Sequence, residues 1–160
     1  MAHTPQIQSA YLCAPLNPRK LDKFLKKAKD VLKLEQFDAI AFRGMSGALV
    51  APLLAHKLHK TLIMVRKGDG ESVRSHSMRN IEGDDAAKRY LIVDDFLASG
   101  NTVRDIAREV HYFTGGKAEC IGAMLYYHHI DSGDPLVVDK LCATWTYPLG
   151  ALKFEPYALP

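Results

Sequence analysis

Apolar positions along the chain follow two patterns, which together predict alternating strands and helices. Unbroken apolar runs are typical of strands buried on both faces of a parallel sheet. Such runs predict strands at 39–42, 61–65, 89–93 and 117–127. Segments that are apolar at every third or fourth position, or along most of their length, predict helices at 18–34, 48–58 and 101–113. This alternation predicts a single-domain α/β fold over residues 1–160, with a mostly parallel twisted sheet, helices on both faces and a core at about 18–127.

The strand at 89–93 runs directly into two adjacent acids and then into a loop of small residues. The segment reads LIVDDFLASGNT over residues 91–102, with Asp94 and Asp95 where the strand ends. Open α/β sheets bind ligands at the carboxyl ends of their strands, and a small-residue loop that leads into a helix suits a phosphate. Two carboxylates beside such a loop indicate a ligand that carries hydroxyl groups or a metal ion next to its phosphate.

This segment resembles the phosphoribosyl pyrophosphate (PRPP) motif of the type I phosphoribosyltransferases. With Ala98 and Ser99 in the loop it is most similar to the adenine phosphoribosyltransferases, and the resemblance covers about residues 38–127. It implies that Asp94 and Asp95 are catalytic residues that bind the two ribose hydroxyls of PRPP. It also implies that the 5′-phosphate is held by a run of loop residues, namely Ala98, Ser99, Gly100, Asn101 and Thr102.

Two other strand ends carry glycines and cations that suit the pyrophosphate of the same ligand. FRGMSG, residues 42–47, resembles the pyrophosphate loop of the family, so Arg43 and Gly44 are predicted ligand-binding residues. Arg66 and Lys67 resemble the Val-Arg-Lys of the family, whose cations face the pyrophosphate. The structural alternatives are a plain strand-to-helix turn and an ordinary basic strand end.

Two further segments are predicted to complete the site. Residues 68–88 are polar and poor in core-forming residues, and a loop this long is functional or disordered, so it is the candidate lid. Its centre, SVRSHSMRN, does not align with the adenine family. A small hood for the base is predicted at about 128–160, with a contribution from 1–16. Trp145, Tyr147 or Phe154 would either stack on a flat ring there or pack in the core.

Bulk composition narrows the classes of partner. The 21 basic and 18 acidic residues leave a net charge of +3, too small to indicate nucleic acid, and the lysines of 20–33 recur at the spacing of a solvated helix face. The 3 cysteines lie far apart, which fits a reducing cytoplasm better than a disulfide framework. No apolar run approaches the ~20 residues of a membrane helix, and the N-terminus lacks a signal pattern. We therefore expect a soluble cytoplasmic protein without a nucleic-acid or membrane partner.

The resemblance implies an enzyme that transfers the 5-phosphoribosyl group of PRPP to a nitrogenous base, with a purine as the expected acceptor, and releases pyrophosphate. It implies Mg²⁺ as the cofactor, bound mainly through PRPP rather than at a dedicated protein metal site, and a homodimer as the assembly. The alternative is a regulatory protein that binds PRPP or a nucleotide on the same fold without turnover, because a fold does not by itself fix a function.

Overall fold

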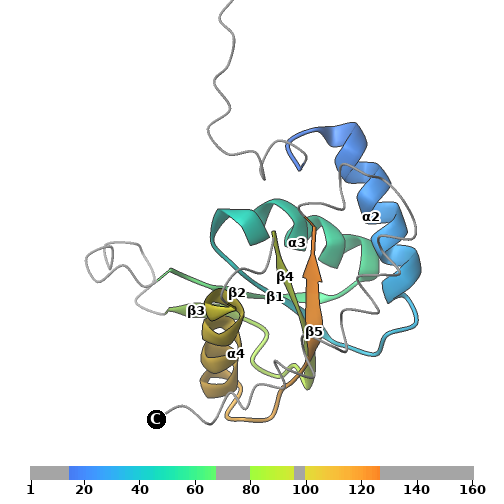
Figure 1. Ribbon diagram of the computed structural model, residues 1–160. Helices are drawn as coiled ribbons and strands as arrows, with labels where there is room; N and C mark the ends of the chain where they lie inside the picture. Colours follow the sequence, from blue (N-terminus) through green and yellow to red (C-terminus); the bar gives the residue numbers. More distant parts are fainter. Residues whose placement is uncertain (1–14, 68–79, 96–99, 127–160) are drawn as a thin grey trace, which may run out of the picture.

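The computed structural model describes residues 15–67, 80–95 and 100–126 of the chain (Figure 1). In chain order the elements are α2 (Pro18–Leu32), β1 (Ala39–Arg43), α3 (Gly44–Leu58), β2 (Thr61–Val65), β3 (Ile81–Gly83), β4 (Arg89–Asp94), α4 (Asn101–Phe113) and β5 (Glu119–Leu125). The five strands form one sheet in the order β3-β2-β1-β4-β5, in which only β3 runs antiparallel to its neighbour. The predicted mostly parallel α/β fold is confirmed.

Helix α2 covers one side of the molecule and follows its sequence signals closely. Asn17 caps the helix by accepting hydrogen bonds from the backbone N–H groups of Arg19 and Lys20, at 3.1 and 3.2 Å. The helix lies beside α3 (Figure 1) and buries its apolar stripe, while its lysines are exposed apart from the half-buried Lys27. Lys26 and Lys33 are paired along the helix with acids, Asp22 and Asp30, which supports the interpretation of a solvated face.

The order in which successive strands are added to the sheet reverses between β1 and β4, although these two strands are parallel. From β1 the chain passes through α3 to β2 on one side, and from β4 it passes through α4 to β5 on the other. Right-handed crossovers in opposite directions place the two helices on opposite faces of the sheet, as Figure 1 shows. Ligands bind at such a switch point in open α/β sheets, outside the carboxyl ends of the strands.

The ladder between β1 and β4 is shorter than the ladders that flank it. It pairs residues only as far as Ala41 with Ile92. The ladder between β1 and β2 continues to Arg43, and the ladder between β4 and β5 continues to Asp94. The two central strands therefore stop pairing before they end, and this happens at the switch point.

Two parts of the predicted organisation are corrected. Helix α3 begins at Gly44, not at residue 48, so the predicted pyrophosphate loop is the first turn of a helix. Strand β3 lies within the predicted 68–88 loop and pairs with β2 through Ile81, Glu82 and Gly83. Gly83 has φ +132, and a Cβ there would overlap the carbonyl oxygen of Leu62, so this edge pairing requires glycine.

Several predictions fall on residues outside the described ranges. They include the small hood at 128–160, the contribution of 1–16 apart from its last two residues, and residues 68–79 of the candidate lid. Among the described residues, no helix combines the length and the apolar character needed to cross a membrane.

Candidate functional site

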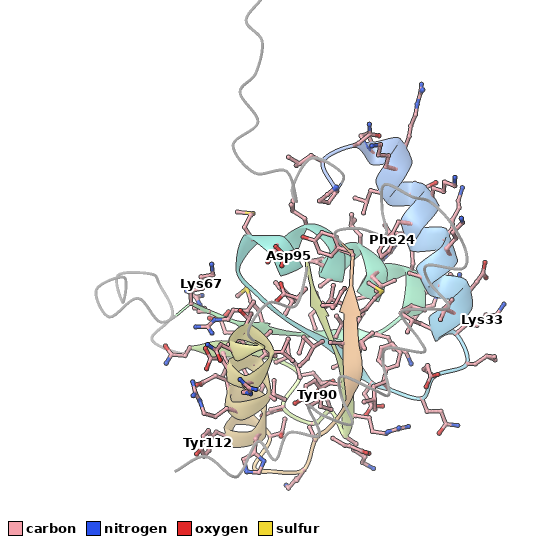
Figure 2. All side chains as sticks on the ribbon, in the orientation of Figure 1. Phe24, Lys33, Lys67, Tyr90, Asp95 and Tyr112 are labelled. Atoms are coloured by element: carbon pink, nitrogen blue, oxygen red, sulfur yellow. The ribbon has the colours of Figure 1, made fainter. Side chains whose placement is uncertain are left out.

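The predicted site residues come from the carboxyl ends of three adjacent parallel strands. Arg43 ends β1, Asp94 ends β4 and Arg66 with Lys67 follows β2 directly. Figure 2 shows Lys67 and Asp95 at this edge of the sheet, with Tyr90 toward the opposite edge. The structure thus brings together residues that lie up to 52 positions apart, counted from Arg43 to Asp95.

The two acids are buried at the end of β4. Asp94 is 4% exposed and Asp95 is 9% exposed. The Oδ1 atom of Asp94 accepts two hydrogen bonds of 3.0 Å, one from the Ser46 hydroxyl and one from the Asp95 backbone N–H. No lysine or arginine of the described ranges forms an ion pair with Asp94. A buried carboxylate without a cation partner is costly, and such groups concentrate at functional sites.

Burial raises the pKa of Asp94 to about 6 from a usual value of 3.8, because desolvation penalises its charged form. The negative charge of the adjacent Asp95 raises this pKa further, while the hydrogen bonds from the Asp95 backbone and from Ser46 oppose the shift. Asp94 therefore titrates close to neutral pH. A ligand that donates hydrogen bonds to it would favour the ionised form.

The helix that follows the acids presents its N-terminus to the same edge of the sheet. Gly100 is the N-cap of α4, with φ +78 and no side-chain cap, and Asn101 and Thr102 are the first two helical residues. The first backbone N–H groups of a helix have no partner within it, and the helix dipole makes this end attractive to an anion. Gly100, Asn101 and Thr102 thus lie at this helix N-terminus and their binding of a phosphate stays a prediction, while Ala98 and Ser99 lie outside the described residues.

Arg43 lies beside these groups, but its guanidinium turns toward α4. Its Nη1 atom is 2.6 Å from Oδ2 of Asp105, and Arg108 is 3.1 Å from the other oxygen of Asp105. The arginine side chain is 18% exposed, so water has little access to the guanidinium end of this ion pair. Arg43 therefore ties the end of β1 to α4, and its role toward pyrophosphate stays a prediction.

The two cations after β2 differ in their surroundings. Arg66 Nη2 is 3.0 Å from Glu82 Oε1 on β3. Lys67 is exposed, and none of the described residues forms an ion pair with it. Its side chain runs past Gly44, because a Cβ on Gly44 would lie 3.0 Å from Cε and 3.8 Å from Nζ of Lys67. The Lys67 ammonium and the N-terminus of α3 therefore form one positively charged corner.

Gly44 has φ +64, so a substitution there tests this corner. We expect Gly44→Ala to lower the free energy of unfolding by about 1–2 kcal/mol, because alanine is strained in the left-handed region. We also expect it to weaken the binding of inorganic pyrophosphate by about tenfold, since displacing Lys67 weakens a charge-assisted hydrogen bond. Denaturant unfolding and calorimetric titration measure the two effects.

Gly115→Ala is the matched control for this prediction. Gly115 has φ +62, but a Cβ there meets nothing within 4 Å. This variant is expected to have the same backbone cost and unchanged pyrophosphate affinity. Wild-type affinity in Gly44→Ala would show that the corner does not bind pyrophosphate.

Ser46 is the residue of this site that the sequence prediction missed. It is the third residue of α3 and reaches Asp94 from a neighbouring strand–helix unit, 48 positions away in sequence. The one signal in the sequence was the serine hydroxyl within FRGMSG. The resemblance to the family pointed to this segment, but the residues predicted from it were Arg43 and Gly44.

Comparisons with known proteins agree with this geometry. An adenine phosphoribosyltransferase from Ureaplasma parvum is 34% identical over 112 residues, which is 62% of this chain and 65% of the relative. A second, from Bifidobacterium longum, is 35% identical over 102 residues, covering 55% of this chain and 53% of the relative. The chain thus spans less than two thirds of the length of these relatives. No family model matches the chain.

Solved structures place the chain among phosphoribosyltransferase folds. A phosphoribosyltransferase from Corynebacterium diphtheriae superposes with a TM-score of 0.53 at 22% identity, over 69% of this chain and 62% of that one. The Mycobacterium tuberculosis orotate phosphoribosyltransferase in complex with PRPP gives a TM-score of 0.52 at 21% identity, over 69% and 61%. The fold is that of the phosphoribosyltransferases. The resemblance predicted from LIVDDFLASGNT is confirmed as a similarity to adenine phosphoribosyltransferases in sequence and to this enzyme class in fold.

Proposed function

We propose that this chain transfers the 5-phosphoribosyl group of PRPP to the ring nitrogen of a base, with a purine as the acceptor, and releases pyrophosphate. The observation that carries the proposal is the buried pair Asp94 and Asp95, which lies at the switch point of the sheet, immediately before the N-terminus of α4. The sequence similarity to adenine phosphoribosyltransferases supports it, and the M. tuberculosis neighbour of the same fold was solved with PRPP.

The proposed reaction breaks one bond to the anomeric carbon of the ribose and forms another. The bond to the pyrophosphate oxygen breaks, the bond to the base nitrogen forms, and the nitrogen loses its proton. The sugar develops positive charge between these events, as in glycoside cleavage. Carboxylates that accept hydrogen bonds from the ribose hydroxyls would hold the ring and stabilise that charge, which is the role proposed for Asp94 and Asp95.

The two phosphate-bearing ends of PRPP would be bound at two helix N-termini. Gly100, Asn101 and Thr102 at the start of α4 would hold the 5′-phosphate. The corner made by Gly44 and Lys67 would hold the pyrophosphate. These helices follow the strands on either side of the switch point, so one extended ligand would span it.

Mg²⁺ is proposed to be bound mainly through the oxygens of PRPP. Mg²⁺ prefers oxygen and keeps several non-protein ligands, which suits a metal that binds through the phosphates of its substrate. When bound, Mg²⁺ would neutralise the pyrophosphate and so help it to leave.

Adenine is the first base to test. The chain has Ala98 where the hypoxanthine and guanine type of the family would place an acid, and its relatives are adenine phosphoribosyltransferases. The proposed assembly is a homodimer, supported by the same resemblance, and the proposed compartment is the cytoplasm, which the three widely spaced cysteines of the sequence fit. Sedimentation at several protein concentrations would test the dimer.

The function is tested by incubating the protein with Mg²⁺, PRPP and each of a panel of bases, and by measuring pyrophosphate release. Turnover with adenine is the expected result. Tight binding of Mg-PRPP with no product from any base would instead favour the regulatory alternative.

A further inference from the structure

A chain of hydrogen bonds links three elements around Asp94. The Tyr126 hydroxyl donates to the Ser46 carbonyl oxygen at 2.8 Å, and the Ser46 hydroxyl donates to Asp94 Oδ1 at 3.0 Å. The Tyr126 backbone N–H lies 3.2 Å from the Asp94 carbonyl oxygen. Tyr126 is fully buried just after β5, so it fixes both the first turn of α3 and the end of β4.

The Ser46 hydroxyl donates to the neighbouring strand rather than along its own helix. A serine inside a helix commonly donates to the carbonyl four residues earlier. For Ser46 that residue is Phe42, which belongs to β1 and not to the helix. The hydroxyl is therefore available for Asp94, on the neighbouring strand.

Both donors to Asp94 use the same oxygen. The Ser46 hydroxyl and the Asp95 backbone N–H meet at Oδ1, so neither of these donors uses Oδ2, and the Asp95 side chain also hydrogen-bonds to this carboxyl group. Turning the carboxylate would break both bonds. Hydrogen bonds donated to a carboxylate also favour its ionised form, which is the form that can accept from a hydroxyl at either oxygen.

We propose that Ser46 is a positioning residue that fixes the Asp94 carboxylate so that Oδ2 faces a ribose hydroxyl of PRPP. The inference deepens the proposed function and rests on it. It also connects the two halves of the site, because the helix that carries Ser46 begins at the corner proposed for pyrophosphate, while Asp94 is proposed to bind the sugar.

The first test measures the pKa of Asp94 directly, by NMR titration of its carboxyl carbon in the ligand-free protein. Ser46→Ala is expected to raise this pKa by about one unit, because a hydrogen bond to the charged form is lost. Ser46→Thr keeps the hydroxyl and is expected to restore the wild-type value. Of the titratable groups around Asp94, Asp95 acts on it through its charge and Tyr126 through Ser46, and neither is changed.

Thr61→Val is the matched control for this titration. The Thr61 hydroxyl also donates to a carboxylate, Asp84 Oδ2 at 2.7 Å, but it lies at the amino end of the sheet. Its loss is expected to leave the pKa of Asp94 unchanged. A folded Ser46→Ala protein with a wild-type pKa for Asp94 would overturn the inference.

The second test measures the affinity for Mg-PRPP by calorimetry at pH 6 and pH 8. A shift in pKa from about 6 to about 7 lowers the ionised fraction of Asp94 about fivefold at pH 6 and about 1.1-fold at pH 8. Ser46→Ala is therefore expected to weaken binding at pH 8, where only the orientation of the carboxylate is lost, and to weaken it about fivefold more at pH 6, where the ionised fraction falls as well. Wild-type affinity at pH 8 would overturn the positioning role. A wild-type chain that binds no Mg-PRPP would overturn the proposed function instead, and the titration would still show whether Ser46 sets the state of Asp94.

Discussion

Replacing Asp94 and Asp95 together with asparagine is expected to lower kcat/KM for pyrophosphate release from Mg-PRPP by about 10²- to 10⁴-fold. Each carboxylate is proposed to accept one hydrogen bond from a ribose hydroxyl, and such charge-assisted bonds are worth about 1.5–3 kcal/mol each. Because a tenfold change in rate corresponds to about 1.4 kcal/mol, two such losses give this range. Asparagine preserves the size of both side chains, so the variant tests charge more than packing.

The chain provides a matched control in a second pair of adjacent acids. Asp84 and Asp85 lie in the turn after β3, toward the amino end of the sheet, where Asp84 accepts hydrogen bonds from Thr61 and Ala86. The Asp84→Asn, Asp85→Asn variant changes the net charge by the same amount and is expected to keep wild-type turnover. If the Asp94, Asp95 double variant retained more than about a tenth of the wild-type rate, the assigned site would be wrong.

The single variant Asp94→Asn is expected to make the protein more stable at pH 8, by up to about 3 kcal/mol. The folded-state pKa of Asp94 is about 6 and its usual value is 3.8. A difference of this size corresponds to about 3 kcal/mol, at about 1.4 kcal/mol for each pKa unit. The folded state binds the proton more tightly than the unfolded state does. Wild-type stability should therefore fall as the pH rises from about 4 through 6, with the full cost present above about pH 7.

Urea unfolding of both proteins at pH 4 and at pH 8 measures this effect. The stability difference is expected to be largest at pH 8 and close to zero at pH 4, where Asp94 is protonated in both states. Asp84→Asn serves as the control, because Asp84 lies in an exposed turn remote from the buried pair. An Asp94→Asn protein less stable than the wild type at pH 8 would show that the buried charge is stabilised by interactions other than those described. Asp94 is thus expected to lower stability and to be kept for its activity.

The sequence predicted the sheet and the acid pair well because both depend on local patterns. Unbroken apolar runs identified β1, β2, β4 and β5, and the transition from Val93 to Asp94 marked a strand end. The start of α3 was wrong because glycine is a poor helix former, and RGMSG resembled a loop. The positive φ of Gly44 lets α3 begin directly after β1. This backbone conformation depends on how the chain leaves the sheet, which the local sequence does not show.

The remaining differences arise from contacts between distant segments. Strand β3 has three residues, too few for any periodic pattern, and it exists through its pairing with β2. Arg43 meets Asp105 across 62 positions, and Arg66 meets Glu82 on that unpredicted strand. The sequence identified both arginines as cations near a ligand, but it could not show that each pairs with a carboxylate. Lys67, in contrast, has none among the described residues.

The short ladder between β1 and β4 has a mechanical consequence. The main chain stops joining the two halves of the sheet at Ala41 and Ile92, while each half stays paired with its outer neighbour. A ligand that bound at both strand ends would supply the missing cross-link. In the free protein, side chains join the halves at this edge, through the Arg43–Asp105 ion pair and the Ser46–Asp94 hydrogen bond. A bound substrate would link the ends of β1 and β4. Amide hydrogen exchange at Phe42 and at Val93 would therefore both be slower than in the free protein.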